Sequence, residues 1–229
     1  MAKPSIIAHR GASGREFENS RAAFMRAVAL EVDGVELDVH STEDGIILVH
    51  HDAELPGIGP IGHLKYTQVV EFRLPNGESV PTLPEVLDIL GDMDVYVEVK
   101  TLAPSFDGAM LSVLEQGPAA TRYAVHSFDH RIVARLGHAR PGLSRGILLS
   151  SYPLDVVALL TAAGADTLWQ DQKLIDAAMV DTIHAAGRRI IAWTVNLAED
   201  AIRLAALGVD GLCGNHPDRL RATLEQAAK

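Results

Sequence analysis

The chain has 229 residues, of which 48% are hydrophobic and 22% charged, and 20 Lys and Arg against 30 Asp and Glu give a formal net charge of −10. The length fits one large domain over residues 1–229, and the composition excludes disordered, collagen-like and coiled-coil proteins. Binding to nucleic acid or to an anionic membrane surface depends on clustered Lys and Arg, so the acidic excess argues against both partners.

A single cysteine, Cys213, excludes an intrachain disulfide framework and fits a reducing compartment. The sequence has no apolar run that approaches the roughly 18 residues of a membrane span. Residues 1–5 are followed by only three apolar residues, 6–8, before His9, and this run is too short for a signal-peptide core. We therefore expect a cytoplasmic protein without stable membrane association.

Short apolar runs rich in β-branched residues alternate with longer segments of helical periodicity, which predicts a parallel α/β sheet. Strands are expected at residues 5–9, 35–39, 95–99, 123–126, 145–149, 166–169, 189–194 and 210–213. Helices are expected at residues 19–30, 82–90, 106–115, 129–138, 154–163, 175–186, 199–207 and 217–227. Eight strand–helix units predict a (β/α)8 TIM barrel, a fold whose usual length is about 250 residues.

The second unit departs from this regularity. An extra strand is expected at residues 46–50, after the turn formed by Asp44 and Gly45. Residues 53–81 that follow are rich in Gly and Pro, and we interpret them as a short loop-like insertion at the mouth of the barrel.

A doubly wound open sheet is the alternative architecture, because Gly57, Gly59 and Gly62 match the glycine spacing of a dinucleotide-binding motif. That motif requires a strand directly before its first glycine and a helix that opens after its last one. Neither is expected here, and Pro60 lies inside the pattern. Chance spacing in a loop is the favoured interpretation.

In a barrel of this kind the catalytic residues stand at the C-terminal ends of the strands. The second expected strand contains Glu36 and Asp38, whose side chains share one face because they are two residues apart. The third expected strand contributes Glu98. Three carboxylates in a barrel interior repel one another unless a cation lies between them, and oxygen ligands suit Mg²⁺ or Ca²⁺. The sequence therefore predicts a divalent metal site.

Positively charged side chains accompany these carboxylates. Arg10 follows the first strand and Lys100 follows Glu98, and a site with a metal, Arg and Lys suits a phosphate ester. His9 and His51 supply two imidazoles for general acid and base catalysis near neutral pH. Together these residues predict metal-assisted cleavage of a phosphodiester.

The run IIAHRGASGREFENSRAAFMRAVALEVDGVELDVHSTEDGIILVHHD resembles the N-terminal signature of the glycerophosphodiester phosphodiesterase family. That signature has His-Arg-Gly, then Pro-Glu-Asn-Thr, then Glu-x-Asp-Val, and closes on His-Asp. The likeness continues through TLPEVL, VEVK, SFD, WTVN and GVDG and so spans nearly the whole chain. Phe17 replaces the usual proline, and Ser20 replaces threonine but keeps a hydroxyl that can cap the first helix.

The resemblance implies a phosphodiesterase barrel that releases glycerol 3-phosphate and an alcohol. The roles that it implies fall on residues of this sequence as follows: catalysis on His9 and His51, metal binding on Glu36, Asp38 and Glu98, phosphate binding on Arg10 and Lys100, and packing against the glycerol on Trp193. The attacking group is either water or the glycerol 2-hydroxyl, which would form a cyclic phosphate first.

Two other functions remain as alternatives. One is a lysophospholipase D or sphingomyelinase D-like enzyme, which would use the same residues on larger lipids. The other is a catalytically inactive barrel that only binds a phosphate ligand. Several polar residues near the expected strand ends, namely His50, His126, Asp44, Asn196 and Asp210, receive no role, and Asn19 is either a site residue or an N-cap.

Overall fold

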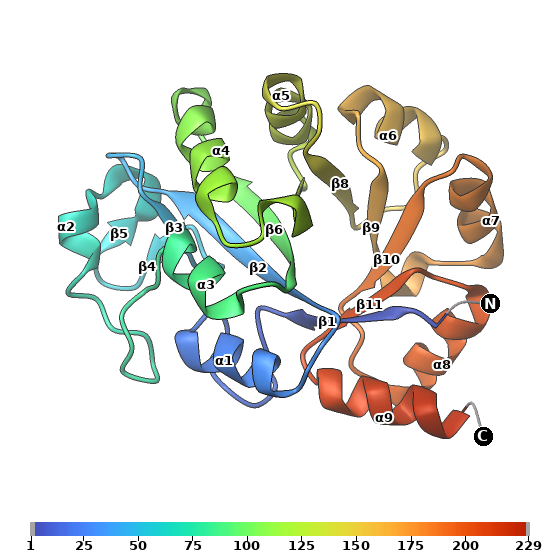
Figure 1. The fold of residues 1–229 in the computed structure, drawn as a ribbon. Coiled ribbons are helices and arrows are strands. Elements are labelled where there is room, and N and C mark those ends of the chain that lie inside the picture. The colour runs from blue at the N-terminus through green and yellow to red at the C-terminus, as the bar shows by residue number, and fades with distance from the viewer. Residues whose placement is uncertain (1–2, 228–229) are drawn as a thin grey trace.

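In a computed structural model, which describes residues 3–227, eight parallel strands close into a barrel surrounded by helices (Figure 1). Strand β1 pairs with β2 on one side and with β11 on the other, which closes the sheet on itself. The predicted TIM barrel is confirmed. Its strands are β1 (Ser5–His9), β2 (Gly34–Ser41), β6 (Asp94–Thr101), β7 (Tyr123–Ser127), β8 (Ser144–Leu149), β9 (Thr167–Asp171), β10 (Arg189–Trp193) and β11 (Gly211–Gly214).

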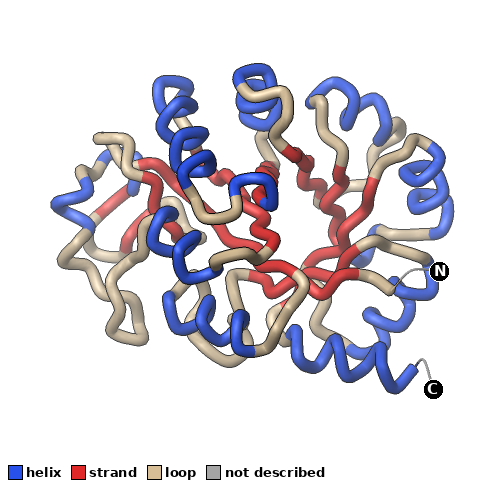
Figure 2. Tube along the Cα trace, in the orientation of Figure 1, coloured by secondary structure: helices blue, strands red, loops and turns tan. Residues whose placement is uncertain are grey.

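The helices form the outer layer of the barrel, as the blue segments around the red strands show in Figure 2. Ser20 caps the first of them by accepting a hydrogen bond from the backbone of Ala23, as its hydroxyl predicted. Among residues 3–227, no helix combines the length and apolar character needed to cross a bilayer. The long helices are α1 (Arg21–Ala29), α3 (Leu83–Leu90), α4 (Asp107–Gln116), α5 (His130–Ala139), α6 (Val156–Ala163), α7 (Ala177–Ala185), α8 (Ala198–Leu207) and α9 (Pro217–Ala227).

Strand β2 shows how the two faces of the sheet differ. Val35, Leu37 and Val39 belong to the apolar cluster that also contains residues of the outer helices, such as Phe24 and Leu83. The alternate residues of β2 therefore face the interior of the barrel. This orientation directs the side chains of Glu36, Asp38 and His40 inward. Each of these polar residues is at most 2% exposed.

A separate apolar cluster fills the barrel interior below these polar residues. Its buried members come from five different strands, and Trp169 is the largest of them. Tyr96 and Trp193 pack against the same cluster. The barrel is thus a packed core with a polar layer at one end, as is usual for this fold. The buried residues of this floor are Ile7, Leu148, Trp169, Ile191 and Cys213.

Residues 53–81 are more ordered than the loop-like insertion that the sequence predicted. Strand β3 (Ile47–Val49) runs antiparallel to β2 and leads into a hairpin of β4 (Glu54–Leu55) and β5 (Gly59–Pro60). The 3-10 helix η1 (Ile61–His63) and helix α2 (Tyr66–Val69) follow. The prediction failed because these elements are short and depend on a small apolar core of their own, formed by Leu48, Leu55, Ile61, Leu64, Val69, Leu74 and Val80.

The insertion is fixed to the start of α1. Phe17 packs against the apolar core of the insertion. The carboxylate of Glu78 accepts hydrogen bonds from the backbone N–H groups of Arg21 and Ala22, at 2.8 and 3.2 Å. Because these N–H groups lie at the helix N-terminus, a carboxylate is a favourable partner for them.

The Gly57 and Gly59 region forms the β4–β5 hairpin, so the dinucleotide-binding interpretation is excluded.

Candidate active site

His9 ends β1 and faces Glu36 in the register of the β1–β2 pair. Its Nδ1 lies 2.7 Å from Oδ1 of Asn215, the residue that follows β11. Since an amide oxygen only accepts, Nδ1 donates, and the lone pair of His9 is on Nε2. Nε2 lies 3.9 Å from Glu36 Oε2. Burial, followed by the charge of Arg10, lowers the pKa of His9 to about 4, so the ring is neutral at pH 7.

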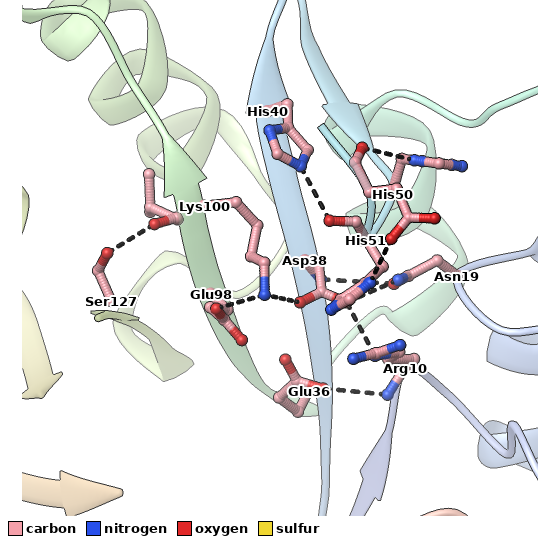
Figure 3. Close-up of polar contacts among 12 residues, drawn as sticks. Arg10, Asn19, Glu36, Asp38, His40, His50, His51, Glu98, Lys100 and Ser127 are labelled. Atoms are coloured by element: carbon pink, nitrogen blue, oxygen red, sulfur yellow. Dashed lines mark hydrogen bonds and ion pairs between the residues drawn. The ribbon is translucent and has the colours of Figure 1, made fainter. Parts of the chain in front are cut away.

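Asp38 lies at the centre of a polar cluster (Figure 3). Its Oδ2 accepts a hydrogen bond from Asn19 Nδ2 at 2.8 Å and lies 3.1 Å from Arg10 Nε. Its Oδ1 lies 3.6 Å from Lys100 Nζ. Burial opposes the charge of this carboxyl, but Arg10 and Lys100 outweigh burial and hold its pKa below the usual range. Asp38 is therefore a charged carboxylate with no exposed surface.

Arg10 and Lys100 are also paired with carboxylates other than that of Asp38. Arg10 Nη1 donates to both oxygens of Glu18, at 2.9 and 2.8 Å. Lys100 Nζ lies 2.8 Å from Glu98 Oε1. Burial would lower the pKa of Lys100, but Glu98 and Asp38 raise it above its ordinary value. Both side chains stay cationic, and both line the same cavity.

Glu36, Glu98 and His126 form a second cluster in the barrel, in which Glu98 lies beside Asp38 in the β2–β6 register. One potential ligand atom of each lies within 4.8 Å of the others, and all three side chains are buried. Burial, with the charges of Asp38 and Glu98, raises the pKa of Glu36 well above its ordinary value. Burial and Asp38 raise the pKa of Glu98 to about 7. Negative charge is therefore strongly disfavoured here in the absence of a cation.

These residues fit a divalent cation. Asp38 Oδ1 is buried and accepts no hydrogen bond from residues 3–227, although Lys100 is near it. Glu98 lies beside Asp38 in the register of the β2–β6 pair. Glu36 and Glu98 bring further carboxylate oxygens within 4.8 Å of each other. A cation would satisfy the orphaned oxygen and remove the repulsion that raises the pKa values of the two glutamates. The predicted ligand set of Glu36, Asp38 and Glu98 is thus brought together by β2 and β6.

His51 lies just beyond β3 and lines the same cavity as His9. Its Nδ1 lies 2.8 Å from Oδ1 of Asp52, so the carboxylate holds the proton on Nδ1. The backbone oxygen of His51 accepts a hydrogen bond from His40 Nε2 at 3.0 Å (Figure 3). His40 in turn contacts Thr101 at the end of β6, which connects the position of His51 to the barrel.

The predicted site residues other than Asp38 line one cavity of about 110 Å³. Its wall includes an aromatic pair, in which the rings of Trp193 and Phe128 meet edge to face with centroids 5.5 Å apart. Lys100 Nζ lies 6.0 Å from the centre of the Phe128 ring. The cavity therefore combines an apolar side with a charged side, and the other lining residues include His126, Leu148, Trp169, Thr194 and Cys213.

The structure places three residues whose role the sequence left open or did not assign. Asn19 is not the N-cap of α1, because Ser20 fills that position and the Asn19 side chain binds Asp38. His126 joins the two glutamates, and Asn215 orients His9. Asn215 follows a barrel strand directly, so the rule that polar residues at strand ends are functional would have found it.

The chain is similar in sequence to known phosphodiesterases. A model of the glycerophosphoryl diester phosphodiesterase family matches residues 9–219. A glycerophosphodiester phosphodiesterase of Caldanaerobacter subterraneus subsp. tengcongensis is 30% identical, with 95% of this chain and 96% of the relative covered. A probable glycerophosphodiester phosphodiesterase of Mycobacterium tuberculosis is 32% identical, with 95% and 89% covered.

A solved structure shares the whole architecture. An Oleispira antarctica phosphodiesterase, determined in complex with the product sn-glycerol-3-phosphate, superposes with a TM-score of 0.91 at 25% identity, with 97% of each chain covered. The family match, the relatives and the barrel confirm the resemblance seen in the sequence. The chain belongs to the glycerophosphoryl diester phosphodiesterase family of TIM-barrel enzymes.

Proposed function

We propose that the chain hydrolyses glycerophosphodiesters to sn-glycerol 3-phosphate and an alcohol, with a divalent cation, Mg²⁺ or Ca²⁺, as cofactor. Family membership supports the reaction, and the product bound to the Oleispira relative supports a small-molecule substrate. The observation that carries the proposal is one cavity whose lining includes the two predicted catalytic imidazoles, two carboxylates and two cationic side chains. These are His9, His51, Glu36, Glu98, Arg10 and Lys100.

Glu36, Asp38 and Glu98 would hold the cation, because their oxygen donors suit a hard ion. When bound, the cation would offset the charge of the carboxylates and polarise a phosphoryl oxygen of the substrate. Arg10 and Lys100 would balance the negative charge of the diester from the other side. Trp193 would pack against the glycerol.

His9 and His51 would act as base and acid. Neutral His9, with its lone pair on Nε2, accepts the proton of the attacking hydroxyl while the new P–O bond forms. His51 donates a proton to the oxygen of the departing alcohol as its bond to phosphorus breaks. Asp52 supports this role because its carboxylate accepts a hydrogen bond from Nδ1 and so orients the ring of His51. The attacking hydroxyl is that of water or the glycerol 2-hydroxyl, and a substrate without the 2-hydroxyl separates the two routes.

The test is release of glycerol 3-phosphate from glycerophosphocholine and glycerophosphoethanolamine by the purified chain. Exhaustive chelation should abolish the release, and added Mg²⁺ or Ca²⁺ should restore it. His9→Ala and His51→Ala should each lower kcat by roughly 10²- to 10⁴-fold, as expected for general acid–base residues. His138→Ala, an exposed position on α5, is the matched control and should keep the full rate.

Each part of the proposal has its own contradicting result. Full activity after chelation would contradict the cation, and unchanged rates in both histidine variants would contradict the acid–base roles. Absence of turnover on every diester would instead favour the barrel that only binds phosphate.

A second candidate substrate is a diester whose glycerol carries an acyl chain, as for a lysophospholipase D. The observation that favours it is a row of exposed apolar side chains in the connections after β7, β8 and β10, at the C-terminal end of the barrel. Their exposed fractions range from 46% to 109%, and the residues are Phe128, Tyr152, Leu154 and Leu197. An apolar rim of this kind beside a polar cavity could take an acyl chain.

The same assay with lysophosphatidylcholine distinguishes the two substrates. If the rim binds an acyl chain, the double variant Leu154→Ser and Leu197→Ser should lose kcat/KM for lysophosphatidylcholine and keep it for glycerophosphocholine. Equal effects on both substrates, or no turnover of the lysophospholipid, would rule out this candidate.

A further inference from the structure

His126 on β7 is buried beside the two glutamates of the cavity. The residue is 1% exposed, and β7 pairs it with Glu98 on β6. Its ring lies flat against Trp169, with centroids 4.2 Å apart and an angle of 5° between the planes. This stacking fixes the plane of the ring and directs Nε2 toward Glu36 Oε1, at 4.0 Å. His126 is therefore held in one orientation, with one nitrogen facing the carboxylates.

Neither nitrogen of His126 has a hydrogen-bond partner that explains this position. Nδ1 is buried and has no partner in the part of the chain that the structure describes. The separation of Nε2 from Glu36 is too long for a hydrogen bond.

A neutral imidazole has one N–H group and one lone pair, and the 4.0 Å separation leaves Nε2 without a hydrogen bond to Glu36 in either tautomer. A cation between the ring and the carboxylates would attract both the Nε2 lone pair and the oxygens of the two glutamates. Nδ1 then carries the ring proton and Nε2 is free to bind the ion, which is the usual way in which neutral histidine binds a metal. The stacking on Trp169 holds the ring ready for that role.

We propose that His126 is a nitrogen ligand of the divalent cation, together with Glu36 and Glu98. The three potential ligand atoms lie within 4.8 Å of one another, close enough to meet at one ion after small side-chain rotations. This inference rests on the proposed cation dependence and adds a nitrogen to a ligand set that the sequence predicted to be all oxygen.

A nitrogen ligand changes which ions the site prefers. All-oxygen sites suit Ca²⁺ and Mg²⁺, whereas imidazole favours transition metals. With His126 in the ligand set, the site should bind Mn²⁺ more tightly than Ca²⁺. His126→Gln replaces the nitrogen by an amide oxygen and should reduce or remove that preference.

The experiment is direct measurement of ion binding, with Mn²⁺ and Ca²⁺ alone as the probes. Calorimetric titration gives the Kd of each ion for the wild-type chain, for His126→Gln and for His9→Gln. Pulsed electron paramagnetic resonance of the bound Mn²⁺ then detects coupling to a histidine nitrogen. The His9 variant is the matched control, because His9 Nε2 also lies 3.9 Å from Glu36.

The wild type should show nitrogen coupling that His9→Gln keeps and His126→Gln loses, and the Kd for Mn²⁺ should rise about tenfold or more in His126→Gln. A wild-type spectrum without nitrogen coupling overturns the inference and needs no variant that might misfold. Coupling that His126→Gln keeps also overturns it, while the cation itself stands. If the wild type binds neither ion, the proposed cation dependence fails as well.

Discussion

Asn215 shows how one hydrogen bond sets the chemistry of a neighbouring residue. Its side chain contacts His9 Nδ1 at 2.7 Å, across 206 positions of sequence. The contact fixes which nitrogen of His9 carries the proton, and an uncharged partner leaves the pKa of the ring low. The identity of residue 215 should therefore control the pH at which His9 can act as a base.

We expect Asn215→Asp to shift the acidic limb of the kcat/KM profile to higher pH, by about one unit or more. A carboxylate at this position stabilises the imidazolium and raises the pKa of His9, so the base becomes protonated earlier as the pH falls. Asn215→Ala, which adds no charge, is the control: it should lower kcat through loss of orientation while that limb stays at or below its wild-type position. Identical limbs in the wild type and the Asp variant would contradict the role of His9.

Single residues such as Asn215 and His126 mark what the sequence leaves undetermined. The carboxylates of β2 were predicted to be near one another because two residues on one strand share a face. The contacts of Asn215 and His126 join segments distant in the sequence. The strand-end rule marks Asn215 as a candidate site residue, but no local pattern says which residue it contacts. Which oxygens of the carboxylate group face cations and which are orphaned also follows only from packing.

At the scale of elements, the loop between β1 and α1 carries much of the site. Arg10 and Asn19 both have positive φ, at 56° and 54°, and Gly11 between them has φ of 78°. A Cβ on Gly11 would lie 2.7 Å from the backbone carbon of Ala23 in α1. The loop therefore needs glycine for two reasons, the backbone conformation and the close approach of a helix.

We expect Gly11→Ala to lower both the free energy of unfolding and kcat/KM, because the loop must move away from α1 and take Arg10 with it. Gly57→Ala is a matched control, since Gly57 has the same φ of 78° and open space around it. Gly57→Ala should lower the free energy of unfolding only through backbone strain, by about 1 kcal/mol or somewhat more. Equal denaturation midpoints and equal activity in the two variants would show that the contact with α1 is unimportant.

Elements differ in how far the sequence determines them. The barrel strands and the long helices were predictable because each repeats a period over many residues, and their ends shift by only one or two positions. The insertion was not, because β4 and β5 are two residues long and are stabilised by the apolar core around Ile61. Short elements of this kind depend on tertiary contacts rather than on local periodicity.

At the scale of the whole molecule, the buried glutamates link stability to pH and to the cation. In protein stripped of divalent ions, burial raises the pKa of Glu98 from its ordinary 4.5 to about 7, and Glu36 shifts in the same direction. The folded state then binds these protons more tightly than the unfolded chain. The contribution of this proton binding to the free energy of unfolding is fully present below pH 4.5 and is lost as the pH rises through about 7.

We therefore expect the increase in Tm caused by added Mg²⁺ or Mn²⁺ to be small near pH 5 and to grow toward pH 8, because the ion replaces protons that the folded state has lost. If the Tm increase changes by several degrees between pH 5 and pH 8, the corresponding change in the free energy of unfolding is about 1–3 kcal/mol in a chain of this size. Thermal melts with and without chelator measure it. In Glu98→Gln the Tm increase caused by the ion should depend less on pH. A Tm increase in the wild type that does not change with pH would contradict the link between proton loss and ion binding.

The apolar floor of the barrel also determines how molecules enter and leave. Ile7, Leu148, Trp169, Ile191 and Cys213 are each at most 3% exposed, so they seal the interior below the polar layer. Among residues 3–227 these side chains close the end of the cavity opposite the mouth, so both products of cleavage would depart through the mouth before another substrate could enter. We therefore expect retained glycerol 3-phosphate to occupy the position of the next phosphate and to inhibit the enzyme competitively.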